Sequence, residues 1–495
     1  MPGRSRGDLG QPLAEHARAA RRDATRRAVE RRGRPVTPGS AAPTASAGRR
    51  SEGRVVDVVV RAADAGDTYL SWRWLDDVHT PHASRLSAAT LKSVLERLDD
   101  ALIAPRSGED PDGVRRALTE GDFSNLAAER DLADHLTAAA LPAPLVQQLL
   151  DRVDRGFHIR FRLTPSPMLA RIPWEVMAVD PTRRLIEVAD ITYDPPAIIH
   201  ASRSRPAVAW RERRTQPAVF IVDPKFPTSR GPRPFGPVFD GVSDSKVLRN
   251  RIREHEEIGG ADAGAHTDSV GRLISREDLS DLLRAAPRSR FFYFGHVTAT
   301  PDEPGTASLH LSDPAMTWGM AEPKRIKDFP TDHRPLSALD LMLGTTMTAD
   351  PAVWTLYGAD RPQAGHEIWP MPPRVALIAC ESGIDYRSAE TFGLVIAMLD
   401  AGAELVTTTR WPLPTGKAFR DHHPDLPRGV SPPVDLGLAV DHAHTLDDPV
   451  HHLADWQRGQ LQLWRAHGEI QYSPLLWAAL IHTLAPMRTE QEPRW

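Results

Sequence analysis

A histidine and the only cysteine of the chain each follow directly on a short apolar run. His296 comes after FFYFG, and Cys380 comes after VALIA. A thiol with an ordinary pKa of about 8.5 is only a few per cent thiolate at pH 7, and a neighbouring imidazole lowers that pKa or takes the proton during attack. The pair can therefore perform nucleophilic catalysis at a carbonyl carbon. The backbone N–H groups of Cys380 and Val297 are the natural donors to the resulting oxyanion.

Each of the two residues also has a simpler interpretation. A lone cysteine is usually a small buried hydrophobic residue, and a lone histidine is usually held by structural hydrogen bonds. Their placement favours catalysis, because open α/β sheets gather catalytic groups at the carboxyl ends of their strands. Gly295 and Gly383 flank the pair and favour tight turns that expose it. The residues by themselves leave both interpretations open.

The elements that must position this pair alternate between strand and helix. Continuous apolar strands that alternate with helices indicate a mostly parallel sheet covered by helices on both faces. We therefore predict an α/β fold. The predicted strands are Ala218–Pro224, Phe291–Gly295, Val375–Ala379 and Glu404–Thr409; the predicted helices are Thr391–Ala401 and Arg276–Ala286, the latter capped by Ser275 with Asp278 in a near capping box.

A smaller α+β region is predicted before this alternation. Its strands are partly alternating or rich in β-branched and aromatic residues, and its helices carry apolar residues at helical spacing. The predicted strands are Val55–Arg61, Thr68–Trp74 and Phe157–Leu163, and the predicted helical segments are Ser87–Ile103 and Glu129–Val153.

Composition divides the chain into four segments. Residues 1–53 form a basic tail, 54–205 the α+β region, 206–488 the catalytic part, and 489–495 a short C-terminal tail. Residues 1–54 hold thirteen arginines against five acidic residues and include a Pro/Ser/Ala linker. We expect the first segment to be a solvated, disordered leader. Docking onto nucleic acid or an acidic partner is its alternative interpretation.

Bulk composition excludes several classes of protein. The chain is 41% hydrophobic and 25% charged, as ordinary soluble globular proteins are. No apolar run reaches the roughly 18 residues that a membrane helix needs, and no signal peptide is visible. A single cysteine excludes an intramolecular disulfide. These features predict a cytoplasmic protein that does not enter a membrane.

Several segments occur in an order that is similar to a known family. LARIPWEVM (169–177), FFYFGH (291–296) and ALIACESG (376–383) are followed by a helix–strand–Trp segment at 390–413 and by SPLLWAALIHTL (473–484). Each piece is weak alone, but the ordered set resembles the CHAT family, a bacterial branch of caspase-like cysteine peptidases that includes relatives of separase. The resemblance covers roughly residues 55–487.

This resemblance implies a caspase-like α/β fold with His296 as general base and Cys380 as nucleophile. It further implies a cysteine endopeptidase that cleaves a protein substrate in a bacterial conflict or cell-death pathway, without a cofactor. Family members often carry tetratricopeptide repeats. We see none here, so we expect a regulatory protein partner in trans. Family members also usually have glycine after the histidine, whereas Val297 here narrows the approach to the oxyanion hole.

Two other functions remain open. A catalytically silent caspase-like scaffold that binds a partner protein is the main alternative, and Val297 is the feature in its favour. A small-molecule cysteine hydrolase is the third. The Pro-rich stretches Pro314–Pro330 and Thr345–Pro373 are expected to form surface loops that shield the cleft.

The remaining candidates are weaker. Asp223 ends the first catalytic strand and can line the pocket that selects a basic substrate residue, although an aspartate that caps a turn is the more ordinary role. Glu381 and Asp385 are rival pocket acids. Trp174 and Glu175 are expected to be structural. Histidines cluster at 422, 423, 442, 444, 451 and 452, but no compact metal-ligand spacing appears, so we expect a solvated polar linker and no metal.

Overall fold

The computed structural model describes most of the chain after its first 53 residues. The described residues are 54–103, 113–197, 199, 203–226, 238, 241–259, 270–300, 303–324, 333–379, 393–427 and 429–485. All of them belong to one compact unit, Gly53–Trp495. The predicted tails, residues 1–53 and 489–495, lie outside the described residues.

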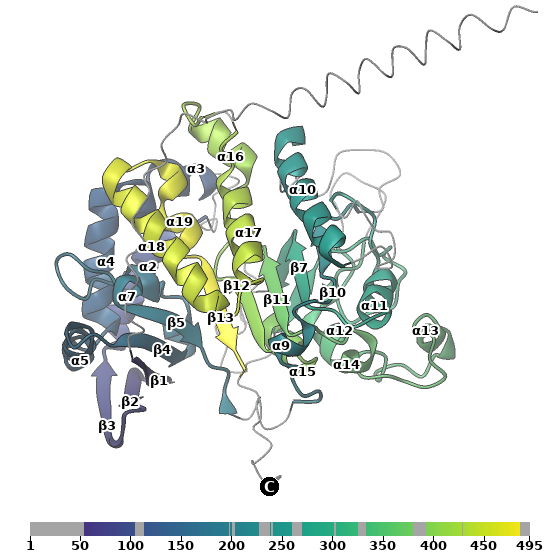
Figure 1. Ribbon diagram of the computed structural model, residues 1–495, viewed down its shortest axis with the longest axis horizontal. Helices are drawn as coiled ribbons and strands as arrows, with labels where there is room; N and C mark the ends of the chain where they lie inside the picture. Colours follow the sequence, from purple (N-terminus) through teal and green to yellow (C-terminus); the bar gives the residue numbers. More distant parts are fainter. Residues whose placement is uncertain are drawn as a thin grey trace, which may run out of the picture. The chain divides into compact units, whose positions relative to one another are not determined.

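A ten-stranded sheet runs through this unit in the order β3-β2-β1-β4-β5-β13-β12-β11-β7-β6 (Figure 1). Its strands are β1 (Val55–Ala65), β2 (Asp67–Trp74), β3 (Asp77–Leu86), β4 (His158–Thr164), β5 (Ala189–Tyr193), β6 (Val219–Val222), β7 (Arg290–Phe294), β11 (Arg374–Ile378), β12 (Leu405–Thr409) and β13 (Leu480–Leu484). Most neighbours run parallel; β1–β2, β2–β3 and β12–β13 are antiparallel. The predicted fold class is confirmed.

Four strands of the predicted catalytic part, β6, β7, β11 and β12, are short and mostly apolar, and we call them the catalytic strands after that prediction. Every residue of β6, β7, β11 and β12 is buried. Burial on both faces requires continuous apolar sequence, which is why these four strands could be predicted. A separate three-stranded sheet, β8 (Val297–Thr300), β9 (Glu303–Leu309) and β10 (Leu336–Ser337), follows β7 in the chain.

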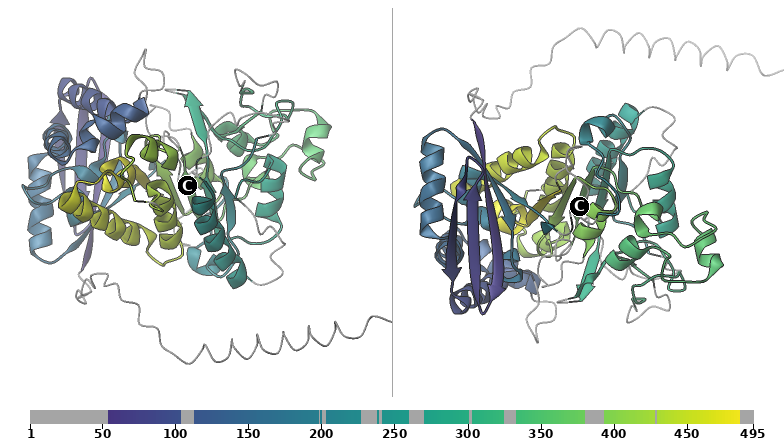
Figure 2. Two further views of the ribbon diagram at one scale, coloured as in Figure 1. Left: turned by 90° about the horizontal axis from the view of Figure 1, so that it is seen from above. Right: turned by 90° about the horizontal axis from the view of Figure 1, so that it is seen from below.

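Two groups of helices pack around the catalytic strands (Figures 1 and 2). In one group α17 contacts both α10 and α18, and it also contacts β11. In the other, α12 contacts α14, α15 and β9, and α15 contacts β12. Their bounds are α10 (Gly241–Gly259), α12 (Ala338–Leu343), α14 (Gly365–Ile368), α15 (Leu394–Asp400), α17 (Pro432–Ala443) and α18 (Pro449–His467). Among the described helices none is both long and apolar enough to cross a membrane.

Further helical elements complete the catalytic part. They are α9 (Trp210–Arg213), α11 (Arg276–Arg284), α13 (Pro351–Thr355), α16 (Gly416–His422), η5 (Ile470–Tyr472) and α19 (Pro474–Trp477). The predicted capping box of α11 is confirmed, since the Asp278 N–H donates to Ser275 Oγ and the Ser275 N–H donates to the Asp278 carboxylate.

The α+β region holds two strands that we did not predict, β3 and β5, and it also differs from our prediction in its helices. Its helical elements are α2 (Ala88–Ala101), α3 (Gly113–Thr119), η2 (Asp122–Ser124), α4 (Leu126–Ala140), α5 (Ala143–Asp154), α6 (Pro167–Ala170), η3 (Trp174–Val176) and α7 (Leu185–Val188). Strand β3 escaped prediction because Leu86 is its only fully buried residue. The predicted segment Glu129–Val153 is two helices, because Pro142 lacks the N–H that a continuous helix needs.

Strand β13 joins the two parts of the sheet. It pairs antiparallel with β12 and parallel with β5, so the strands before and after it run in opposite directions. The amino ends of β4 and β5 therefore lie at the same edge of the sheet as the carboxyl ends of β11 and β7. The predicted boundary between residues 205 and 206 falls between β5 and β6, and the sheet continues across it.

Candidate active site

Two neighbouring parallel strands place the predicted dyad positions at one edge of the sheet. In the pairing of β7 with β11, Phe294 lies opposite Ile378. The Gly295 N–H donates to the Ile378 carbonyl at 3.3 Å and extends the pairing by one step. His296 stands two positions after Phe294, and Cys380 stands two positions after Ile378. Cys380 itself, with Glu381 and Asp385, lies outside the described residues.

Tyr293 holds the turn that carries His296. Its hydroxyl donates to the carbonyl of His296 at 2.7 Å and lies 3.0 Å from the carbonyl of His310. A Cβ on Gly295 would stand only 2.7 Å from the Tyr293 ring and hydroxyl. Glycine is thus required because the phenol lies against this backbone, and the imidazole of His296 remains partly exposed.

The backbone N–H of Val297, the first residue of β8, points away from the neighbouring strand β9. Val297 lies opposite Leu309, and the His310 N–H donates to the His296 carbonyl at 3.1 Å. This pattern marks Val297 and Leu309 as a pair that does not exchange backbone hydrogen bonds, so the Val297 N–H is directed away from β9. The Val297 side chain is only 4% exposed and packs in the hydrophobic core.

Two buried imidazoles lie behind this turn. His310 Nδ1 is 2.7 Å from His333 Nε2, and His310 Nε2 is 2.9 Å from Thr298 Oγ1. The ring of Phe226 packs against both histidines. Burial lowers the pKa of His310 well below its ordinary value, and the neighbouring His333 adds to this effect. His310 is therefore neutral at pH 7 and adds no positive charge beside His296.

The peptide that precedes Cys380 is anchored from the next strand. Thr409, the last residue of β12, donates its hydroxyl hydrogen to the carbonyl of Ala379. Thr409 and Ala379 are both buried. The backbone directly before Cys380 is thus held by a hydrogen bond from β12.

Asp223 lies at the same edge, one strand beyond His296. It directly follows β6, and its N–H donates to the Phe294 carbonyl at 2.7 Å. Its φ of 47° is in the left-handed region, which Asp tolerates better than most residues. Its carboxylate accepts a bond from the Val238 N–H at 3.3 Å, and the residue is 7% exposed. These contacts fit an aspartate that holds a turn.

A buried ion pair ties the first part of the chain to this edge. Arg410 follows Thr409 directly, and its Nη2 donates to both carboxylate oxygens of Glu175, at 2.8 and 3.0 Å. Burial raises the pKa of Glu175, and the charge of Arg410 opposes that rise. Trp174 is fully buried beside it. The predicted structural roles of Trp174 and Glu175 agree with these contacts.

The opposite, amino-terminal edge of the same strands holds two buried arginines that face each other in register. Arg290 begins β7, and it donates to the carboxylate of Asp441 on α17 at 2.6 Å. The same carboxylate is 2.7 Å from Arg251 Nε and 2.9 Å from His255 Nε2. Although burial alone would raise it, the charge of Arg290, the hydrogen bond from His255 and the charge of Arg251 hold the pKa of Asp441 well below its usual range.

Arg374 begins β11 and closes the end of α17. Its guanidinium donates to the carbonyls of His444, Leu446 and Asp447, which follow the helix, and it stacks on Trp210 at 3.8 Å. Burial lowers its pKa to about 10, so it still carries its charge at pH 7. Bonds from an arginine to the last carbonyls of a helix also favour the helix dipole.

Two predictions about the surrounding segments are wrong. The histidine-rich stretch is not a polar linker, because it lies largely in α16, α17 and α18, and His444 is 1% exposed beside Thr407. The stretch Thr345–Pro373 is not only a surface loop. Trp369 is 1% exposed, and its indole N–H donates to the Arg276 carbonyl on α11.

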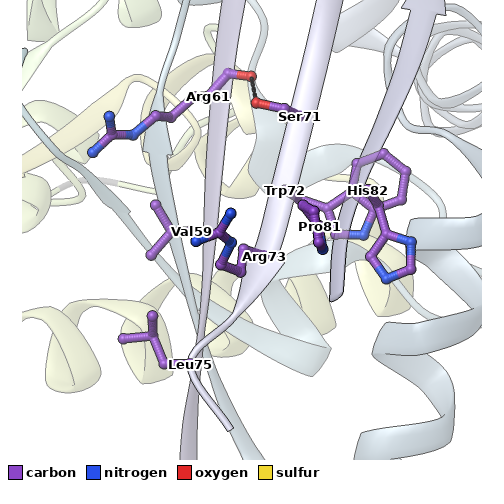
Figure 3. Close-up of a pocket in the computed structure, with 8 residues that line it drawn as sticks. All are labelled: Val59, Arg61, Ser71, Trp72, Arg73, Leu75, Pro81 and His82. Carbon is purple, nitrogen blue, oxygen red and sulfur yellow. Dashed lines mark hydrogen bonds between the residues drawn. The ribbon is translucent and has the colours of Figure 1, made fainter. Parts of the chain in front are cut away.

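A cavity of about 450 Å³ lies far from this site, on the α+β region (Figure 3). Its lining includes Val59 and Arg61 on β1, Arg73 on β2, Leu75 just after β2 and Pro81 on β3. Five strands, β4, β5, β13, β12 and β11, separate β1 from β7 in the sheet order. We therefore do not assign this cavity to the chemistry of His296.

Sequence reasoning missed the side chains that support the site. Tyr293 and Thr409 are buried within apolar or β-branched strands and read as core residues. Arg290 and Arg374 carried a usable signal, because a charged residue directly before a fully apolar strand needs a buried partner. Their partners lie in α10, α17 and the segment after α17, which no local pattern connects to them.

A protein family and solved structures of separase are similar to this chain. The CHAT domain matches residues 130–484. Among curated proteins none matches the chain. Two crystal structures of the separase–securin complex of Saccharomyces cerevisiae are similar at 11% and 10% identity, with TM-scores of 0.38 and 0.37. The alignments cover 89% and 87% of this chain but only 30% of each separase-complex chain.

Proposed function

This chain belongs to the CHAT domain family, and from that premise we propose that it is a cysteine peptidase that cleaves a protein substrate. His296 is the general base and Cys380 the nucleophile. The observation that carries the proposal is the register of β7 and β11. Because Phe294 lies opposite Ile378, the two strands end together, and the histidine and the cysteine follow them at the same distance along the chain.

The reaction divides into two steps that the pair can perform. His296 takes the proton of the Cys380 thiol as sulfur attacks the scissile carbonyl carbon, and the carbonyl oxygen becomes an oxyanion. The imidazolium then gives this proton to the leaving amine as the C–N bond breaks. Water, deprotonated by His296, hydrolyses the thioester and restores the thiol.

The oxyanion needs N–H donors that are fixed before the reaction. The Val297 N–H meets part of this requirement, since it is directed away from β9 and its residue is anchored by a buried side chain. In our proposal the Cys380 N–H is the second donor. Valine stands here where family members usually have glycine, and the backbone N–H donor is retained because only the side chain differs.

Substrate choice and control belong to the same proposal. Asp223 lies one strand from His296 and, with Glu381 or Asp385, would favour a basic substrate residue. Because the Asp223 carboxylate already accepts a backbone bond, any such preference would be modest. We further propose that a protein partner regulates the enzyme in trans, in a bacterial conflict or cell-death pathway.

Mapping of new protein N-termini tests this function. Host cells that express the wild-type chain should show cleavage products that are missing with Cys380→Ala and with His296→Ala. The double variant should be little worse than either single one, because groups that act as a unit are not additive. Products that persist in Cys380→Ala would contradict the proposal.

Thiol labelling provides an independent readout. The chain has one cysteine, so iodoacetamide should label the native protein once, with a rate midpoint below the ordinary thiol pKa of about 8.5. His296→Ala should move this midpoint upward. Labelling only after denaturation would exclude a nucleophilic role and would leave a partner-binding scaffold as the function.

A further inference from the structure

Two histidines and one aspartate from three separate elements meet where β4 and β5 begin. His158 is the first residue of β4, Asp190 is the second of β5, and His451 lies in the first turn of α18. One nitrogen or oxygen atom from each lies within 4.8 Å of the other two. His158 Nε2 and His451 Nδ1 approach the same atom, Asp190 Oδ2, at 2.7 and 2.9 Å.

The carboxylate of Asp190 is held in one orientation. Arg458, two turns further along α18, donates to Oδ1 of Asp190 and also to Asp455. Oδ2 is thereby directed at the two imidazoles. Asp190 is buried, whereas the side chains of His158 and His451 are 31% and 39% exposed. The group is thus formed within the protein and still open to ions from solvent.

Asp455 gives His451 a second carboxylate on the other side of its ring. His451 Nε2 lies 3.5 Å from Asp455 Oδ2. Histidines that bind metals usually direct their other ring nitrogen at a carboxylate, which fixes the tautomer. A cation on His451 Nδ1 would leave the hydrogen on Nε2, where it faces Asp455. Without a cation, the hydrogen on Nδ1 would instead face Asp190.

We propose that His158, Asp190 and His451 bind a divalent first-row metal ion, with Zn²⁺ the preferred one. Two imidazole nitrogens and one carboxylate suit zinc and its neighbours, whereas Mg²⁺ and Ca²⁺ prefer oxygen ligands alone. Tetrahedral zinc with bonds of about 2.0–2.1 Å separates its ligand atoms by about 3.3 Å. The two imidazole nitrogens reach that spacing from Asp190 Oδ2 by retreating about 0.5 Å, and they must take the same spacing from each other, where they now lie within 4.8 Å.

The site would fasten α18 to the α+β region. His451 belongs to a helix that follows the catalytic strands in the chain, whereas His158 and Asp190 belong to β4 and β5. We had expected no metal, because no compact ligand spacing occurs in the sequence. The ligands come from three distant segments, which no spacing rule can reveal. The proposal does not depend on the peptidase function, since β13, β12 and β11 separate β5 from β7.

Metal titration of the full chain tests the site. All proteins carry Cys380→Ala, so that a thiol cannot bind the ion. After removal of metal with a chelator, the parent should bind one Zn²⁺ by calorimetry and give visible tetrahedral Co²⁺ absorption bands. Saturating Zn²⁺ should raise its Tm by about 2 °C or more. Mg²⁺ at the same concentration should do neither.

Substitutions identify the ligands. His451→Ala and His158→Ala should each weaken Zn²⁺ binding at least about tenfold and remove the Tm shift. His452→Ala is the matched control, because His452 is the exposed next residue of the same helix turn, and it should bind like the parent. Equal affinity in the parent and His451→Ala would overturn the proposal. So would a parent that binds no Zn²⁺, which would identify a protonated ion-pair cluster instead.

Discussion

The two edges of the catalytic strands differ in how their polar groups are used. At the amino-terminal edge, Arg290 and Arg374 are buried, and each makes several direct bonds to α17 or the residues just after it. At the carboxyl edge, His296 is partly exposed, and the N–H of Val297 points away from β9. The amino-terminal edge holds the strands in place, and in our proposal the carboxyl edge presents groups to a reactant. In that proposal, stability and chemistry are thus separated along strands of only five residues.

The largest effect on stability is expected at the amino-terminal edge. Arg290→Met removes one cation from the buried carboxylate of Asp441, and breaking a buried pair of this kind costs about 3 kcal/mol. Arg253→Met on the exposed face of α10 is the matched control and should change the unfolding free energy by less than about 0.5 kcal/mol. Urea unfolding measures both. Equal unfolding free energies of the two variants would contradict the stabilising role that we assign to the amino-terminal edge.

A smaller effect is expected beside His296. Gly295→Ala puts a Cβ 2.7 Å from the Tyr293 ring, and overpacking of this size costs about 1–3 kcal/mol. The displaced phenol should also misplace His296 and lower peptidase activity more than stability alone explains. Gly459→Ala in α18 is the control, because its Cβ meets nothing within 4 Å; it should be neutral or stabilise by up to about 1 kcal/mol. Thermal unfolding and activity assays of both variants decide the point.

The smallest effect per residue is expected from the buried histidines between the edges. Burial lowers the pKa of His482 to about 3 and that of His444 well below its ordinary value. Below the unfolded value of about 6.5, the unfolded chain binds protons that the folded chain does not, so stability falls as pH falls. Each such histidine contributes about 1.4 kcal/mol per pH unit at most.

Urea unfolding between pH 7.5 and 5 measures this slope, above the range where carboxylates titrate. His482→Gln should make the slope shallower by up to about 1.4 kcal/mol per pH unit, because one buried imidazole is removed. His452→Gln, at an exposed position, should leave it unchanged. An unchanged slope in His482→Gln would show that this imidazole does not govern the acid sensitivity.

Local patterns were sufficient for much of the fold. The four apolar catalytic strands and the capping box at Ser275 were readable, because burial on both faces and caps leave direct marks in the sequence. Strand β3 left no such mark, since it has one buried residue, and Pro142 was overlooked within a helical pattern.

The candidate site divides in the same way. We placed His296 and Cys380 at the ends of two apolar runs, and β7 and β11 do end in register, while the pairing of the two residues stays a prediction. Asp441 and the group around Asp190 were invisible, because their partners are far away in the sequence, and Tyr293 was hidden because it stands within an apolar strand. Side chains that work at a distance need the folded chain to bring them together.

The place of β13 bears on how this protein can be made. β13 is the last described strand in chain order, yet it lies between β5 and β12 in the middle of the sheet. A ribosome therefore releases both partners long before it releases the strand that joins them. Until then each half of the sheet presents an open edge, and open edges are sites of aggregation and of capture by chaperones. A stop codon a few residues before Leu480 would leave both edges open for good.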